Sequence, residues 1–282
     1  MANKKAPFVE RKLLPPKSDV IFKMLFGDAR NKDILIDFLK SILNLDDDEY
    51  EHITITDPHL KRERIKDKLG IVDVKLTSSS GKIIHIEIQV LEQEELPERV
   101  TYYNAKILIS QLKSGNEFET LQKTISIVIT DFNMIKDNKK YHYTFELTDK
   151  ETGAKFTDLI EIHTLELKKI PQESDNTVKY NWMQFLKAEK EEEFDMIANT
   201  SPAINKAVME VKRLSQSERA QMLYDDRQKA IWDEKSRLKT ARNQGIKEGI
   251  NQGALKRNIE IIENGFKNGF SVEQIRNSQR IS

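Results

Sequence analysis

The sequence contains no cysteine. This absence excludes a disulfide framework, a cysteine-based zinc site and a thiol nucleophile. No apolar run approaches the length of a membrane span, and the first residues lack the apolar stretch of a signal peptide. We therefore expect a cytoplasmic chain that is not inserted in a membrane.

A net charge of either sign is also absent, because 46 Lys and Arg residues balance 46 Asp and Glu residues. Such a balance argues against a protein that coats nucleic acid by bulk electrostatics. Segment 201–282 nevertheless carries sixteen basic and ten acidic residues, and this excess adds a modest nonspecific attraction to phosphates. With 33% charged and 38% hydrophobic residues, the chain is lean for a single globule and is expected to include an elongated helical part.

A β-hairpin is predicted where two runs of alternating β-branched and polar residues, 70–76 and 83–90, flank a turn-forming segment at 77–81. Successive side chains of a strand point to opposite faces, so the two faces of the hairpin can be assigned. One face is aliphatic and comprises Val72, Val74, Leu76, Ile84, Ile86 and Ile88. The other face carries the polar residues Asp73, Lys75, His85, Glu87 and Gln89.

Asp73 and Glu87 form a candidate pair of metal ligands on this polar face. A hard divalent cation requires oxygen ligands that converge from a rigid base and leave room for water and a phosphate. The alternative is that the polar face is simply the solvated side of an antiparallel sheet. Periodicity alone does not decide between the two, and on the pattern alone the solvated face is the commoner case.

The hairpin and its surroundings resemble a known nuclease family. Asp73 at one strand, followed in the next strand by Glu87-Ile-Gln89, is similar to the core of the PD-(D/E)XK nuclease superfamily, with Gln89 at the usual place of a lysine. Segment 17–27, the helix around Arg99 and the Gly-rich charged C-terminus resemble the Rpn family of recombination-promoting nucleases, also called putative transposases. The similarity runs from about 14 to 169 and resumes near 240.

The resemblance implies a fold class and a division of the chain. We expect an α/β core of the restriction-endonuclease type, a mixed sheet flanked by helices, over residues 8–171. A helical extension is expected at 172–239 and a Gly-rich helical tail at 240–282. The implied function is metal-dependent cleavage of DNA phosphodiester bonds, associated with recombination or mobile elements.

The resemblance also assigns roles to individual residues. Asp73 and Glu87 would ligate Mg²⁺, or Mn²⁺ or Ca²⁺, with the backbone carbonyl of Ile88 as a further ligand. Gln89 would orient the attacking water, but an amide can neither supply positive charge nor transfer a proton as lysine does. Lys75 or Lys106 would then substitute for the missing lysine.

Two helices are expected to bring supporting residues to the site. Asp19 lies in the first turn of a helix predicted at 17–26, where the superfamily often places an acid; the alternative role is a favourable interaction with the helix dipole. Arg99, Tyr102 and Lys106 share one stripe of a helix predicted at 92–115 and would grip a phosphate, unless the stripe is a solvent face.

The remaining pattern predicts the other elements of the core. We expect a helix at 32–43 and strands at 53–57, 124–130, 141–147 and 159–167. The strand at 124–130 is expected in the middle of the sheet. The basic segment 59–68 is a candidate contact for a phosphate backbone. His142 and His163 are expected to be surface residues of strands rather than metal ligands.

Gly245, Gly249 and Gly253 recur every fourth residue in the tail and would share one face of a helix. This face permits the close approach of a second helix and hence homo-oligomers; the alternative is a flexible hinge. A rival to the nuclease function is a protein that has kept the fold without the chemistry and acts as a DNA-binding or oligomeric interaction module. RNA as substrate also stays open, because residue types alone do not distinguish it from DNA.

Overall fold

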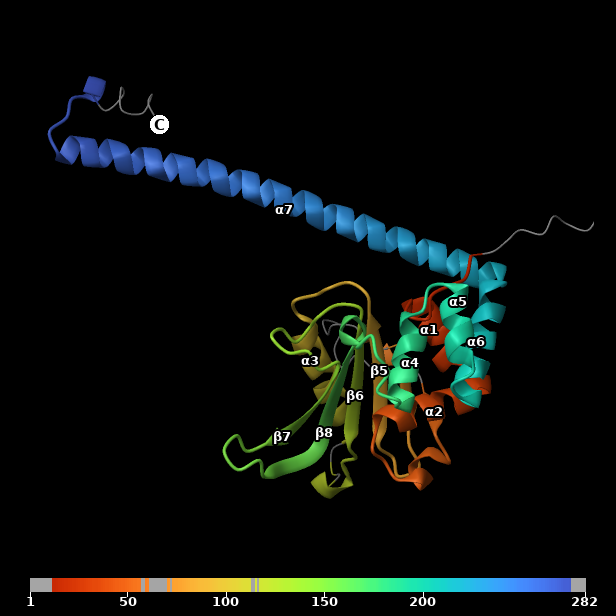
Figure 1. The fold of residues 1–282 in the computed structure, drawn as a ribbon. Helices are drawn as coiled ribbons and strands as arrows, with labels where there is room; N and C mark the ends of the chain where they lie inside the picture. The colour runs from red at the N-terminus through yellow and green to blue at the C-terminus, as the bar shows by residue number, and fades with distance from the viewer. Residues whose placement is uncertain are drawn as a thin grey trace, which may run out of the picture. The chain divides into compact units, whose positions relative to one another are not determined.

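The computed structural model describes residues 12–56, 59–60, 70–71, 73–112, 115 and 117–274. Its contacts define one compact unit that ends at Tyr224 and a second unit that begins at Asp225. Figure 1 shows the first unit as a twisted sheet with helices packed beside it. The predicted fold class, a mixed sheet flanked by helices with a helical C-terminal extension, is confirmed.

The main sheet has six strands in the spatial order β1–β4–β5–β6–β8–β7. These strands are β1 (Thr54–Thr56), β4 (Val74–Thr77), β5 (Ile83–Gln89), β6 (Thr124–Thr130), β7 (His142–Thr148) and β8 (Lys155–Glu166). The neighbours β5, β6 and β8 are parallel, and every other pairing is antiparallel. Gln89 is in register with Thr130, and Thr130 with Glu166, so the carboxyl ends of three strands lie along one edge. A separate two-stranded sheet pairs β2 (His59–Leu60) with β3 (Gly70–Ile71).

The aliphatic face of the sheet carries the main hydrophobic core, and most of the helices pack there. These helices are α1 (Asp19–Phe26), α2 (Lys32–Ile42), α4 (Val178–Lys187), α5 (Glu191–Ala198) and α6 (Pro202–Ser215). Trp182 of α4 contacts the rings of Phe26 and Phe38, and its Nε1 donates a hydrogen bond to Asp37 at 2.7 Å. The helices after the sheet therefore complete the same core as the helices before it.

The polar face of the hairpin is covered by helix α3 (Leu96–Ile109). Leu96 and Val100 of α3 pack on Val128 of β6 in a second hydrophobic cluster. His85 and Glu87 of β5 are 1% and 4% exposed. The face is thus buried, and the alternative of a solvated sheet face is wrong.

Most predicted elements are confirmed, with small shifts in their ends. The helices predicted at 17–26 and 32–43 correspond to α1 and α2, and the segment 124–130 is the fully buried strand β6. The predicted helix at 92–115 is shorter, because α3 ends at Ile109. His163 is 4% exposed and hydrogen-bonds to His142 at 2.9 Å, so the expectation that His163 lies at the surface is wrong.

Short 3₁₀ helices connect the elements, and one of them supports the hairpin turn. They are η1 (Ala29–Asn31), η2 (Asp47–Tyr50), η3 (Phe118–Thr120) and η4 (Leu167–Lys169). Glu49 of η2 accepts hydrogen bonds from Ser78 Oγ at 2.6 Å and Ser80 Oγ at 2.7 Å, and it pairs with Lys82. These contacts hold the turn between β4 and β5, in which Gly81 has a φ of +92°.

Helix α7 (Glu218–Lys267) begins in the first unit and continues through the second. It passes through Gly245, Gly249 and Gly253 without a break. None of the helices in the described ranges has an apolar stretch that would cross a membrane. The last strand of the sheet ends at Glu166, five residues before the predicted boundary at 171, and we propose that the independent folding unit extends to Tyr224.

Candidate active site

The candidate site is built where β4 begins and β5 ends. Val74 pairs with Ile86, so Asp73 and Glu87 are the next residues along the two strands. The backbone amide of Asp73 donates to the Ile86 carbonyl at 3.0 Å, and Oδ2 of Asp73 accepts from the amide of Ile88 at 2.7 Å. The Asp73 carboxylate is therefore fixed against the backbone of β5 rather than free to rotate.

The direction of the Ile88 backbone follows from the pairing of β5. The Ile83 amide donates to Lys123, and the Gln89 carbonyl accepts from the Asp131 amide, so the odd-numbered residues of β5 face the β6 side. The amide and carbonyl of one strand residue point to the same side. The Ile88 carbonyl hence points to the side of β4, where its amide already binds Asp73.

Each carboxylate is paired with a cation from a different helix. Lys23 Nζ of α1 lies 3.0 Å from Asp73 Oδ1. Arg99 of α3 donates to Glu87 Oε1 at 2.5 Å and also to Gln93. The site is therefore enclosed by helices from both faces of the sheet, and positive charge from each helix balances the buried acids.

Burial dominates the electrostatics of the two carboxylates. It raises the pKa of Asp73, while the Lys23 ammonium opposes the shift and the charge of Asp19 adds to it. Burial also raises the pKa of Glu87, against the effect of Arg99 and with a further contribution from the charge of Asp73. Asp73 is thus affected by the like charge of Asp19 and itself affects Glu87, and like charges at short range favour the binding of a cation.

The donor set fits a hard divalent cation. Oε2 of Glu87 is buried and has no hydrogen-bond partner among the described residues, although a buried oxygen normally has one. In the described ranges, no group of three or more His, Asp and Glu side chains is arranged to hold a metal. A metal at Asp73 and Glu87 would therefore need backbone and water oxygens as additional ligands, a mixture that Mg²⁺ accepts.

The other predicted site residues differ in their surroundings. Gln89 Nε2 donates to Glu87 Oε1 at 2.8 Å, so Gln89 holds the carboxylate in place. Lys75 lies opposite His85 on the neighbouring strand. Burial is the larger cause and the charge of Lys75 the smaller cause that lower the pKa of His85 to about 3. The ring of Tyr102 lies 5.8 Å from Lys106 Nζ and 5.9 Å from the ring of Tyr103. The side chains of the basic segment 59–68 lie outside the described residues.

Lys23 is the site residue that sequence reasoning did not single out. Asp19 and Lys23 are four residues apart in α1, which places both on one face of the helix. That spacing was readable from the sequence. Gln93, which precedes α3 and accepts from Arg99, left no such signal because it lies in a loop.

Comparison with known proteins identifies the family of the chain. A family model described as PD-(D/E)XK nuclease family transposase matches residues 16–241, which include α1, the complete sheet and α3. Searches of curated proteins and of solved structures gave no match. The matched range covers most of the chain and contains Asp73, Glu87 and Gln89, and the protein therefore belongs to the PD-(D/E)XK nuclease family transposases.

Proposed function

We propose that the protein is a Mg²⁺-dependent endonuclease that hydrolyses DNA phosphodiester bonds, in recombination or in mobile elements. The observation that supports this most directly is the pair of buried acids at the ends of β4 and β5, with Glu87 Oε2 unpartnered among the described residues. Family membership supports nuclease chemistry. Burying two like charges costs stability, and a cation that binds both acids offsets that cost.

Asp73, Glu87 and the Ile88 carbonyl are the proposed ligands of the cation. A bound Mg²⁺ would polarise the phosphate and lower the pKa of the attacking water. Oδ2 of Asp73 is held by the Ile88 amide at 2.7 Å, which fixes the geometry of this ligand before substrate arrives. Hydrolysis joins the water oxygen to phosphorus and breaks one P–O ester bond, and the departing oxygen takes up a proton.

Gln89 and Arg99 are proposed to position the substrate and the water. Gln89 Nε2 is engaged by Glu87, and its Oε1 is an acceptor that orients a water. Arg99 supplies the positive charge that Gln89 lacks, since its guanidinium reaches Glu87 from α3 at 2.5 Å and can bind a phosphate oxygen. Lys23, Lys75 and Lys106 are the lysines proposed to complete the charge around the reacting phosphate, with Asp19 and Tyr102 beside them.

The decisive experiment is cleavage of supercoiled plasmid in Mg²⁺, in Mn²⁺ and in EDTA. Asp73→Ala and Glu87→Ala should each lower the nicking rate by at least about 100-fold, because both would remove a metal ligand. Asp158→Ala, an exposed aspartate in β8, is the control and should keep the wild-type rate. Equal inactivity of wild type and both variants would favour the rival function, a nuclease fold that only binds DNA. Equal activity would contradict the assignment of the chemistry to Asp73 and Glu87.

We further propose that the second unit pairs with a second copy of the chain. A Cβ atom added at Gly245, Gly249 or Gly253 meets nothing within 4 Å, so this face of α7 is open to a neighbour. Ile246 and Ile250 are 52% and 66% exposed and flank the glycines. Small and aliphatic residues on one side of a helix let another helix approach closely.

A further inference from the structure

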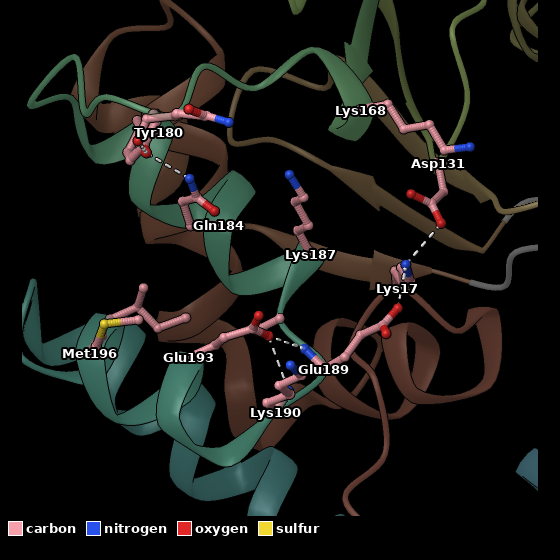
Figure 2. Close-up of a pocket in the computed structure, with 13 residues that line it drawn as sticks. Lys17, Asp131, Lys168, Tyr180, Gln184, Lys187, Glu189, Lys190, Glu193 and Met196 are labelled. Atoms are coloured by element: carbon pink, nitrogen blue, oxygen red, sulfur yellow. Dashed lines mark hydrogen bonds and ion pairs between the residues drawn. The ribbon is translucent and has the colours of Figure 1, made fainter.

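A cavity of about 700 Å³ lies in the first unit, where β6 ends. Its walls come from the approach to α1, the end of β6, η4, α4 and α5, and Figure 2 shows the side chains that line it. The cavity is polar on the side of the sheet, and α5 contributes the apolar Met196 and Ile197 together with the acid Glu193. We refer to it below as the α4 cavity.

The α4 cavity lies at the same edge of the sheet as the end of β5, the strand that carries Glu87. Asp131, which lines the cavity, donates its backbone amide to the Gln89 carbonyl at 2.9 Å. Lys168, on the same wall, follows the end of β8. Because β5, β6 and β8 are parallel, the candidate site, Asp131 and Lys168 lie in a row along one edge. In sheets with parallel strands, ligands commonly bind at the carboxyl ends of the strands.

The acids of the cavity already have partners within the wall. Lys17 binds Asp131 at 2.8 Å and Glu189 at 2.7 Å, and it is the cation that these two acids share. Glu193 accepts hydrogen bonds from the backbone amides of Glu189 and Lys190 at 2.7 and 3.1 Å. The acids therefore hold the wall together.

Lys168, Lys187 and Lys190 also line the cavity, and of these Lys168 follows the end of β8 and Lys187 ends α4, whereas Lys190 lies next to Glu193. Neither Lys168 nor Lys187 forms an ion pair with another residue in the part of the chain that the structure describes. Figure 2 shows Lys187 extending from the end of α4 into the space bordered by Lys17 and Asp131. Gln184, on the same side of α4, adds an amide that can donate to an anion.

The separation between the ends of β5 and β8 distinguishes a single phosphate from a chain of linked phosphates as the ligand. Neighbouring strands are about 4.8 Å apart, so the ends of β5 and β8 are separated by about 10 Å. One phosphate cannot contact both ends, whereas a chain of linked phosphates can. We propose that the α4 cavity binds the backbone of a nucleic acid strand through Lys168 and Lys187, while a neighbouring phosphate of that strand lies at Asp73 and Glu87. This inference rests on the proposed function for the location of the reacting phosphate.

Binding measured without catalysis tests the inference. Full-length protein is titrated in EDTA against a fluorescent oligonucleotide over a range of NaCl concentrations. The variant Lys168→Ala/Lys187→Ala should bind at least about tenfold more weakly, and the slope of log K against log salt should fall by roughly 0.7 to 0.9 per lost phosphate contact. The loss should be the same for unrelated sequences, because the contacts are to the backbone.

Lys150→Ala provides a control matched to each of the single substitutions Lys168→Ala and Lys187→Ala, since Lys150 is exposed in the turn between β7 and β8 and each of the three substitutions removes one positive charge. It should retain the wild-type affinity and slope. The inference is overturned if the double variant binds as wild type does, or if Lys150→Ala weakens binding as much as the cavity substitutions. If wild type cleaves nothing but the lysine-dependent binding is observed, the proposed chemistry fails while the binding surface stands.

Discussion

At the scale of single residues, the candidate site places stability and function in opposition. Asp73 is held in one orientation by Ile88 and is paired with Lys23, yet burial still raises its pKa. A carboxylate whose pKa is higher in the folded state than in the unfolded state weakens folding once it ionises. The wild-type protein without metal should therefore lose stability as the pH rises from about 4, the pKa of an aspartate in the unfolded chain, through the higher pKa of Asp73 in the folded state.

The substitution Asp73→Asn tests this opposition directly. Without metal, the variant should be more stable than wild type by about 1 kcal/mol at pH 8, because asparagine keeps the acceptor for Ile88 without the charge. The gain should vanish below the unfolded pKa of aspartate, near 4, where Asp73 is protonated in both states. Urea unfolding in EDTA at several pH values measures it.

Metal should reverse the order of the two proteins. Mn²⁺ binds the folded wild type and stabilises it, whereas Asp73→Asn has lost a ligand and should gain little. Asp158→Asn, at an exposed position, should follow wild type in both conditions. A destabilised Asp73→Asn at pH 8 would show that the pair with Lys23 outweighs the cost of burial and would contradict the argument.

At the scale of elements, the hairpin that carries Glu87 is held by a neighbour distant in sequence. Burial would raise the pKa of Glu49, but hydrogen bonds from Lys82, Ser78 and Ser80 hold it at about 2. Glu49→Ala should lower the free energy of unfolding at pH 7 by about 2 kcal/mol, since it leaves these donors without their acceptor. Glu51→Ala, at an exposed position just after η2, should cost little.

The pH dependence of the Glu49→Ala effect has a definite sign. The folded pKa of Glu49 is below its unfolded value of about 4.5, so its contribution is present above that pH and is lost as the pH falls towards 2. Wild type and Glu49→Ala should therefore converge in acid. If the free energies of unfolding of the two proteins stay a constant difference apart from pH 7 to pH 3, the charge of Glu49 does not stabilise the turn.

The elements themselves were largely predictable, but their partners were not. Alternation and turn residues predicted the hairpin, and the apolar run predicted β6, because both patterns are local. The burial of His85 and Glu87 was not readable, since it depends on α3 packing over β5. Periodicity reveals that a helix has an apolar face, but not which residues cover it, and so Phe38 could not be named as a partner of Trp182.

The residues of the candidate site that lie on the hairpin or in a motif of the family could be predicted from the sequence. Asp73 and Glu87 came from strand pairing, and Arg99 from a resemblance to the family. The α4 cavity was not foreseen, because Lys17, Asp131 and Lys187 come from three separated segments that meet only through the parallel order of β5, β6 and β8. Long-range contacts of this kind leave no periodic signal in the sequence.

At the scale of the whole molecule, the glycine face of α7 is the feature that predicts an assembly. The substitution Gly249→Leu has opposite expected effects on an unpaired helix and on a close helix pair. Replacing a helical glycine improves helix propensity by up to about 1 kcal/mol, so an unpaired helix would only become more stable. In a close helix pair, the added side chain would hold the backbones apart and weaken association.

We expect Gly249→Leu to shift the protein from dimer towards monomer while its helix content stays the same or rises. Sedimentation equilibrium over a range of concentrations gives the mass, and circular dichroism gives the helix content. Asn251→Leu is the matched control, because a residue two positions along a helix points to the far side from Gly249 and should leave the dimer intact. A wild-type protein that stays monomeric at every concentration, or a Gly249→Leu dimer of unchanged affinity, would contradict pairing through this face.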